Sequence, residues 1–174
     1  HGALEAYTQS YGRLQNDMWA AKLGLGEFID SDESLIVELN ALLQEVETDM
    51  TIFFRLLCSI EEPEIDLLSD AFYDSENIPT ELWNAWLSKW WTRVEGTPKR
   101  QEMTNANPKY VLRNWMAQLA IDAAESGDFS ICEELYLVLK NPYEEQVEFE
   151  EKWFQKRLEW ARHRVGCSML SCSS

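Results

Sequence analysis

Two cysteines near the end of the sequence are the side chains best suited to chemistry. Cys167 and Cys172 lie in the stretch Cys-Ser-Met-Leu-Ser-Cys-Ser-Ser, which is polar and has no periodicity that would bury it. A thiol in an exposed, serine-rich end is accessible to oxidants and to other thiols. We therefore predict that residues 165–174 form an exposed tail with accessible, reactive thiols.

Other interpretations of the four cysteines stay open. Two cysteines separated by four residues can close a small local disulfide, and a terminal cysteine can also be an exposed thiol with no role. A nucleophilic role for Cys167 with His163 as its base is disfavoured, because no pocket-forming element follows them. Cys58 and Cys132 lie within apolar helical patterns, where a cysteine is expected to be a small buried side chain.

The remaining patterns do not predict a catalytic, cofactor or metal site. Gly24-Leu25-Gly26 comes nearest to a phosphate-binding loop, but it follows a predicted helix and lacks the third glycine and the lysine. The two histidines are far apart, and no Glu-x-x-His or Cys-x-x-Cys spacing occurs. We interpret acidic pairs such as Glu144-Glu145 as solvated carboxylates. No catalytic, metal-binding or cofactor-binding residue is expected in this chain.

Apolar residues recur at helical spacing along almost the whole chain. The first five are spaced by three and four and predict one face of a helix that stops near Gly24: Leu4, Tyr7, Tyr11, Leu14 and Met18. Further helices are predicted at 30–46, 49–57, 64–72, 79–91, 109–126, 128–140 and 144–164, with a short segment between Thr97 and Pro108.

Capping patterns set three of these boundaries. Asp30 and Glu33 have the spacing of a capping box. Asn107-Pro108 is typical of an N-cap followed by the first helical residue, and Gly127 is placed to end that helix.

The absence of alternating patterns and turn sequences excludes a sheet. We predict an all-α fold of about seven to nine helices. A chain of 174 residues with 45% hydrophobic content can bury one sizeable core, so one compact domain over residues 1–174 is expected.

The net charge of −16, from 31 acidic and 15 basic residues, argues against binding to nucleic acid or to an anionic membrane surface. No apolar run reaches the roughly eighteen residues of a membrane span, and the start resembles no signal peptide. Since the sequence does not begin with methionine, we expect a piece of a larger protein.

Acidic and basic residues are unevenly distributed. Between residues 27 and 81 the only basic residue is Arg55, whereas six basic residues crowd positions 89–113. The favoured interpretation is two solvated faces or internal pairing between them. The other is a docking surface for another domain or protein.

Four tryptophans lie close together on one predicted helix: Trp83, Trp86, Trp90 and Trp91. Large aromatic residues at helical spacing are usually core, although tryptophan is also favoured at interfaces. We predict a core position, with an exposed ridge as the alternative.

Several segments together resemble a known family. The longest is residues 107–114 (Asn-Pro-Lys-Tyr-Val-Leu-Arg-Asn), which continues into 117–121 and 123–128. Residues 18–25, 49–56, 141–146 and the Ser-Cys-Ser-Ser ending also match. In this order they resemble the C-terminal region of the selenoprotein O family, also called YdiU, over nearly the whole chain. The charged stretch 148–164 departs from the Pro-rich, loop-like ending of the family.

The resemblance implies an enzymatic role for a longer protein. Family members have a kinase-like fold, bind ATP with Mg²⁺ or Mn²⁺, and transfer AMP to Ser, Thr or Tyr hydroxyls of protein substrates. Their nucleotide- and metal-binding residues belong to the kinase-like part, which lies upstream of the matched region. The chain is then expected to be the C-terminal helical domain of a bacterial, cytoplasmic member, packed on its own kinase-like lobes.

The resemblance also gives Cys172 a role. It occupies the position of selenocysteine in the animal proteins and of cysteine in bacterial members, where it resembles a redox element able to pair with a cysteine of the kinase-like part. Cys167 is the second redox candidate in the same tail. The competing hypothesis is a stand-alone acidic helical module that binds other proteins and has no enzymatic role.

Overall fold

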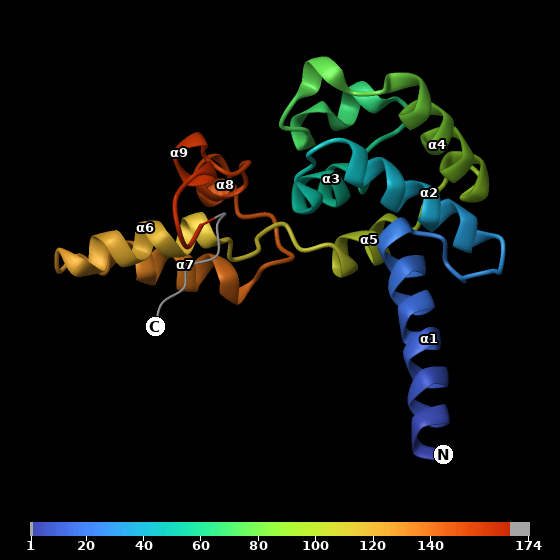
Figure 1. Ribbon diagram of the computed structural model, residues 1–174, viewed down its shortest axis with the longest axis horizontal. Helices are drawn as coiled ribbons and strands as arrows, with labels where there is room; N and C mark the ends of the chain where they lie inside the picture. The colour runs from blue at the N-terminus through green and yellow to red at the C-terminus, as the bar shows by residue number, and fades with distance from the viewer. Residues whose placement is uncertain (1, 168–174) are drawn as a thin grey trace. The chain divides into compact units, whose positions relative to one another are not determined.

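The computed structural model describes residues 2–167 and contains only helices and the loops between them. The helices, in chain order, are α1 (Gly2–Leu23), α2 (Asp32–Glu45), α3 (Met50–Leu57), the 3-10 helices η1 (Ile65–Ala71) and η2 (Ser75–Asn77), α4 (Thr80–Arg93), α5 (Arg100–Ala106), α6 (Asn114–Glu125), α7 (Ser130–Lys140), α8 (Val147–Trp153) and α9 (Glu159–Arg162) (Figure 1). No strand occurs between residues 2 and 167, which confirms the all-α prediction. In this part of the chain, no helix is both long enough and apolar enough to cross a bilayer.

The chain divides into two compact units, and the boundary lies between Asn107 and Pro108. Unit 1 holds the helices from α1 to α5, and unit 2 holds those from α6 to α9. The composition predicted a single core, but buried side chains gather within each unit, including a cluster confined to unit 2.

Tryptophans of α4 form the centre of unit 1. The side chains of Trp83, Trp86 and Trp90 are at most 1% exposed. The indole N–H of Trp86 donates to the carbonyl of Leu35 at 2.8 Å, and that of Trp90 donates to the carbonyl of Leu23 at 2.8 Å. These bonds tie α4 to α2 and α1 while the rings fill the core. The core prediction is confirmed for these three tryptophans, whereas Trp91 is half-buried.

A partly buried ion pair orders the start of α2. The guanidinium of Arg93 donates to both carboxylate oxygens of Asp32, at 2.7 and 3.0 Å. The backbone N–H of Ile29 donates to the same carboxylate at 2.9 Å. The predicted capping box of Asp30 and Glu33 is therefore wrong, because Asp32 is the acidic residue that orders this turn. Pairing between the acidic and basic stretches is confirmed.

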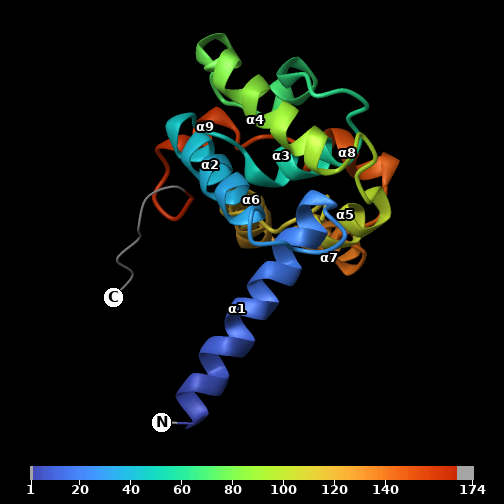
Figure 2. The same cartoon turned by 90° about the vertical axis from the view of Figure 1, so that its right-hand side faces the viewer.

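Helix α1 is confirmed, but much of its apolar face is not covered by unit 1. Its N-terminal half extends away from the other helices of that unit in both ribbon views (Figures 1 and 2). The five predicted face residues are between 46% and 72% exposed: Leu4, Tyr7, Tyr11, Leu14 and Met18.

Two predicted helix boundaries in unit 2 are wrong because tertiary contacts override local signals. Helix α6 begins at Asn114 rather than near residue 109, since the backbone N–H groups of Lys109 and Tyr110 both donate to the carbonyl of Pro142, at 2.8 and 3.0 Å. The predicted helix 144–164 is divided into α8 and α9. Between them the carbonyl of Gln155 accepts a bond from Arg113 at 2.8 Å instead of continuing a helix.

The end of α6 follows the prediction. Gly127 has a φ of +86°, which L side chains rarely adopt, and the N–H of Asp128 donates to the carbonyl of Ala123 at 3.0 Å. The carboxylate of Asp128 then accepts from the N–H of Ser130 at the start of α7.

Substitution of Arg93 tests how much its ion pair with Asp32 contributes to the stability of unit 1. Arg93→Ala leaves the Asp32 carboxylate buried without its cation, and we expect a loss of about 3 kcal/mol in the free energy of unfolding of unit 1. The control Lys89→Ala breaks the pair with Glu38, whose side chains are 58% and 43% exposed, and should cost less than about 1 kcal/mol. Amide hydrogen exchange in α2 and α4 measures the loss in the free energy of unfolding for each variant. Equal losses in Arg93→Ala and Lys89→Ala would show that the pair with Asp32 contributes no more than an exposed pair.

Candidate functional site at the base of the C-terminal tail

The structure shows the start of the cysteine-containing tail but not Cys172, which lies outside the described residues. Cys167 is 7% exposed and belongs to the buried cluster of unit 2, together with Trp115, Trp153 and Ala161. The prediction that the whole of 165–174 is exposed is therefore wrong at Cys167.

One polar face of α6 holds the chain just before the tail. Asn114, Gln118 and Asp122 are four residues apart and so share that face. The Asn114 amide donates to the carbonyl of Cys167 at 3.1 Å, and the Arg164 guanidinium donates to both oxygens of Asp122 at 2.8 Å. The Gln118 amide also donates to Asp122, at 2.8 Å. We call these five residues the tail anchor.

In the tail anchor, the Asp122 carboxylate is stabilised in its charged form and the backbone turns at Gly166. The hydrogen bonds from Arg164 and then from Gln118 hold the pKa of the Asp122 carboxyl below its usual value. Between Arg164 and Cys167, Gly166 takes a φ of +86°, which a side chain would strain. The segment therefore turns at a position suited to glycine and is held on both sides of that turn.

The extended segment before α6 is fixed by buried polar side chains. The ammonium of Lys109 is almost fully buried and bonds to Glu145 and Glu150, the latter at 2.9 Å. Burial opposes its charge, but the two carboxylates outweigh that cost and raise the pKa of Lys109. The hydroxyl of Tyr110 donates to the carbonyl of Gln146 at 2.9 Å, and burial raises the pKa of this tyrosine. These contacts set the place at which α6, and with it the tail anchor, begins.

The other two cysteines differ from each other in exposure. Cys58 is buried, as predicted, and burial raises the pKa of its thiol. Cys132 is exposed, so its predicted burial is wrong. On α7 the inward face carries Leu135 and Val138, and Cys132 lies about 100° around the helix from Ile131, which shares that face. His163 is exposed whereas Cys167 is buried, an arrangement that disfavours a Cys–His pair.

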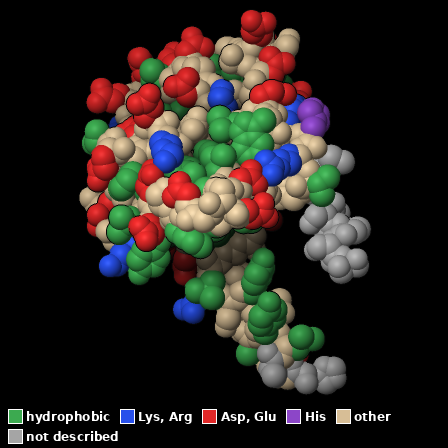
Figure 3. Space-filling view, turned by 90° about the vertical axis from the view of Figure 1, so that its left-hand side faces the viewer, with side chains coloured by type: hydrophobic (Ala, Val, Ile, Leu, Met, Phe, Trp, Pro, Cys, Tyr) green, Lys and Arg blue, Asp and Glu red, His purple; other side chains and the backbone are tan. Residues whose placement is uncertain are grey.

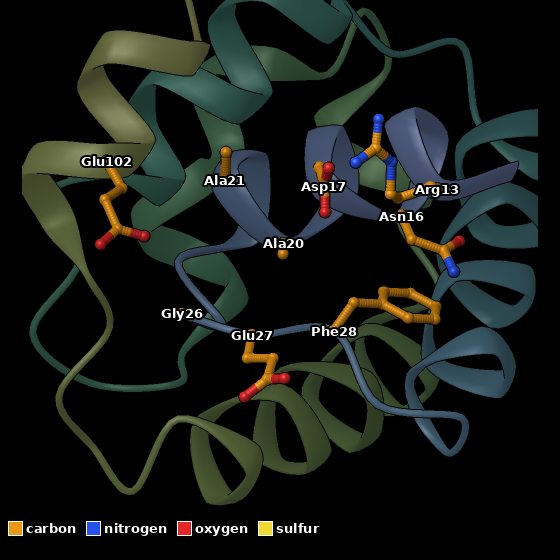
Figure 4. A pocket seen from close by; sticks show the side chains of 9 residues that line it. All are labelled: Arg13, Asn16, Asp17, Ala20, Ala21, Gly26, Glu27, Phe28 and Glu102. Atoms are coloured by element: carbon orange, nitrogen blue, oxygen red, sulfur yellow. The ribbon is translucent and has the colours of Figure 1, made fainter. Parts of the chain in front are cut away.

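The groove beside α1 in unit 1 is not suited to a nucleotide. It has a volume of about 440 Å³ and lies between α1, the loop that follows it and α5 (Figure 4). Its lining contains the carboxylates of Asp17, Glu27 and Glu102 with the single guanidinium of Arg13, and this acidic balance repels phosphate. Sequence reasoning did not find this groove, because its residues come from separate segments.

No metal-binding cluster is formed within the described part of the chain. Among residues 2–167, no group of three or more His, Cys, Asp or Glu side chains could hold a metal ion. The predicted acidic pair Glu144-Glu145 contributes Glu145 to the ion pair with Lys109 instead.

Comparison with known proteins identifies relatives of this chain. The family model described as "Protein adenylyltransferase SelO" matches residues 1–140. The protein nucleotidyltransferases YdiU of Flavobacterium johnsoniae and Aromatoleum aromaticum are each 45% identical to it, over 98% and 100% of the chain. The one of Rhodopirellula baltica is 42% identical over 98%. The chain spans about 35% of the length of the first two relatives and 36% of the third.

The pKa of Asp122 reports whether the tail anchor forms in solution. Because the carboxylate is stabilised by Arg164, its NMR titration should fall below the ordinary pKa of about 3.9. The ion pair contributes at pH values above the unfolded pKa and is lost as the pH falls through the lower, folded pKa. Arg164→Gln should raise the pKa of Asp122, whereas the control Lys140→Gln should not. An unchanged pKa in Arg164→Gln would show that the anchor is not formed.

Proposed function

Since the chain belongs to the protein adenylyltransferase SelO family, we propose that it is the C-terminal helical part of an enzyme that transfers AMP from ATP to proteins. The observation that carries this proposal is its 45% identity to protein nucleotidyltransferases of which it spans only 35%. The acceptors are Ser, Thr or Tyr hydroxyls. In the transfer, the hydroxyl oxygen bonds to the α-phosphorus of ATP, pyrophosphate leaves, and the hydroxyl proton passes to a base.

We assign nucleotide and metal binding to the part of the enzyme upstream of this chain. The described residues do not fit a Mg²⁺ or Mn²⁺ site, since they bring no three suitable side chains together. The metal, when bound upstream, neutralises charge on the ATP phosphates. The chain contributes a folded support that packs on the kinase-like lobes and carries the tail. We place the enzyme in the bacterial cytoplasm.

The second part of the proposal is that Cys172 regulates the enzyme through its redox state. Its thiol pairs with a cysteine of the kinase-like part, and the new S–S bond restrains the motion of the lobes. Forming this bond from two thiols releases two protons and two electrons, which a low-molecular-weight disulfide accepts by thiol–disulfide exchange. Reduction returns both thiols and releases the restraint.

The tail anchor supports this role through its geometry. Cys167 is held by Asn114 within the core of unit 2, and Cys172 follows five residues later. Five residues span at most about 18 Å, so the backbone of Cys172 stays within that distance of Cys167. A tethered thiol has a much higher effective concentration for a partner within its reach than a free one has. Buried Cys167 is the less reactive member of the predicted redox pair.

The alternative function is a stand-alone acidic module that binds other proteins. Its supporting observation is the net charge of −16. Part of this acidity is used inside unit 1, where Arg93 pairs with Asp32 and Lys89 pairs with Glu38. This internal pairing favours the role of a structural part over that of an acidic docking surface.

The test is AMP transfer by the whole enzyme, measured with ATP labelled on its α-phosphate. We expect labelled protein, with transfer several-fold lower under oxidised glutathione than under dithiothreitol. Cys172→Ala should be equally active in both conditions, because it cannot form the disulfide. The control Cys132→Ala should keep the wild-type response, since Cys132 belongs to neither the tail nor its anchor.

Two results would contradict the two parts separately. Absence of label transfer under every condition would overturn the proposed activity. Transfer that is equal in oxidising and reducing conditions for the wild-type enzyme would overturn the redox role of Cys172 and leave the activity standing.

A further inference from the structure

Helix α1 carries a continuous apolar face that unit 1 does not cover. We name it the α1 face and define it by Leu4, Tyr7, Tyr11, Leu14 and Met18, which are all at least 46% exposed. Spaced over fourteen residues, they extend about 21 Å along the helix. Figure 3 shows hydrophobic side chains along the extending end of α1. A contiguous apolar stripe of this length marks an interaction surface.

Unit 1 packs against another side of α1, because the buried residues Ala20 and Leu23 lie more than 100° around the helix from the α1 face. Lys22, one turn after Met18, lies with its ammonium 4.1 Å from the centre of the Phe54 ring and donates to Asn107 at 2.7 Å. Trp19, next to Met18, also contacts the ring of Phe54. The α1 face is therefore left uncovered by unit 1 along its whole length, Met18 included.

The exposed part of α1 needs packing to be stable. A helix in water gains little from its own hydrogen bonds, and short or isolated helices are marginal without a packed apolar face. The rings of Tyr7 and Tyr11 stack on each other with centroids 6.1 Å apart, but they remain more than half exposed. The side of α1 away from this face is polar, with Gln9 and Arg13 exposed on it. The helix thus has one side suited to a partner and one suited to water.

Charge and length together select the partner. A second copy of the chain would bring together two bodies that each carry a net charge of −16, which disfavours self-association. The relatives, in contrast, contain almost two thirds of their length outside the matched region. A surface of that remaining part, apolar at its centre and basic at its rim, complements both the α1 face and the acidity of the chain.

We propose that the α1 face docks in an apolar groove of the upstream part of the same polypeptide, with its side chains as anchors about one turn apart. This inference rests on the proposed function for the existence of that upstream part. It adds to the proposed function by naming the surface of unit 1 that contacts the upstream part. The tail that carries Cys172 belongs to unit 2.

The test is site-specific photocrosslinking in the whole protein. Tyr11→p-benzoylphenylalanine places the probe on the α1 face, and Gln9→p-benzoylphenylalanine places it on the opposite side of the same helix. We expect irradiation at position 11 to yield crosslinks within one polypeptide, to peptides upstream of this chain, in several-fold higher yield than at position 9. Mass spectrometry of digested protein identifies the linked peptides.

Three results would overturn the docking proposal. These are crosslinks between two copies, crosslinks only to residues 108–174, and a yield at position 11 no higher than at position 9. Amide exchange gives a second measure: Leu14→Asp should speed exchange in residues 4–18 of the whole protein, while Gln9→Asp should not. Equal exchange in both variants would also overturn it.

AMP transfer measured on the same samples separates this inference from the proposed function. Crosslinks from position 11 to upstream peptides in a protein without transferase activity would support the docking proposal and contradict the proposed function. Transferase activity in a protein whose position 11 gives no upstream crosslink would support the proposed function and contradict the docking proposal.

Discussion

Asn107 is the buried polar residue on which the packing of unit 1 depends. Its side-chain oxygen accepts from the Lys22 ammonium at 2.7 Å, its amide donates to the Lys22 carbonyl at 2.9 Å, and its own carbonyl accepts from Arg55 at 3.0 Å. These bonds join α1, α3 and the end of α5. Burial lowers the pKa of Lys22, so the charge is retained only against a desolvation cost that Asn107 and the Phe54 ring offset. No apolar residue at position 107 could satisfy these groups.

The residues that follow Asn107 also hold elements together through polar side chains, in unit 2. The side chains of Lys109 and Tyr110 both bond to the loop between α7 and α8. The Arg113 side chain bonds to the carbonyl of Gln155, and that of Asn114 to the carbonyl of Cys167. The segment 107–114 therefore holds buried polar contacts of unit 1 and of unit 2 in consecutive residues. Within unit 2, these bonds fix the start of α6 and the carbonyl of Cys167.

Periodicity was sufficient to predict the all-α fold and most helices. In α2, α4 and α7 the buried residues are among the apolar residues whose helical spacing predicted an inward face. It failed where distant partners decide the local structure. Asn107-Pro108 has the local form of a helix start, yet the amide of Asn107 bonds to Lys22 and α6 begins at Asn114. The exposures of Cys132 and Cys167 were reversed for the same reason, since burial depends on which face meets the core. The role proposed for Cys172 rests on the family resemblance, and no spacing rule reveals its partner.

The central proposal is that this chain supports and regulates an enzyme whose nucleotide site lies upstream. The most direct measurement is photoaffinity labelling of the whole protein with azido-ATP in the presence of Mg²⁺, followed by identification of the labelled peptides. The account predicts label on peptides upstream of this chain, removed by excess ATP, and none on residues 2–167. Label within those residues that excess ATP also removes would contradict it, because it would place a nucleotide site in the helical part itself.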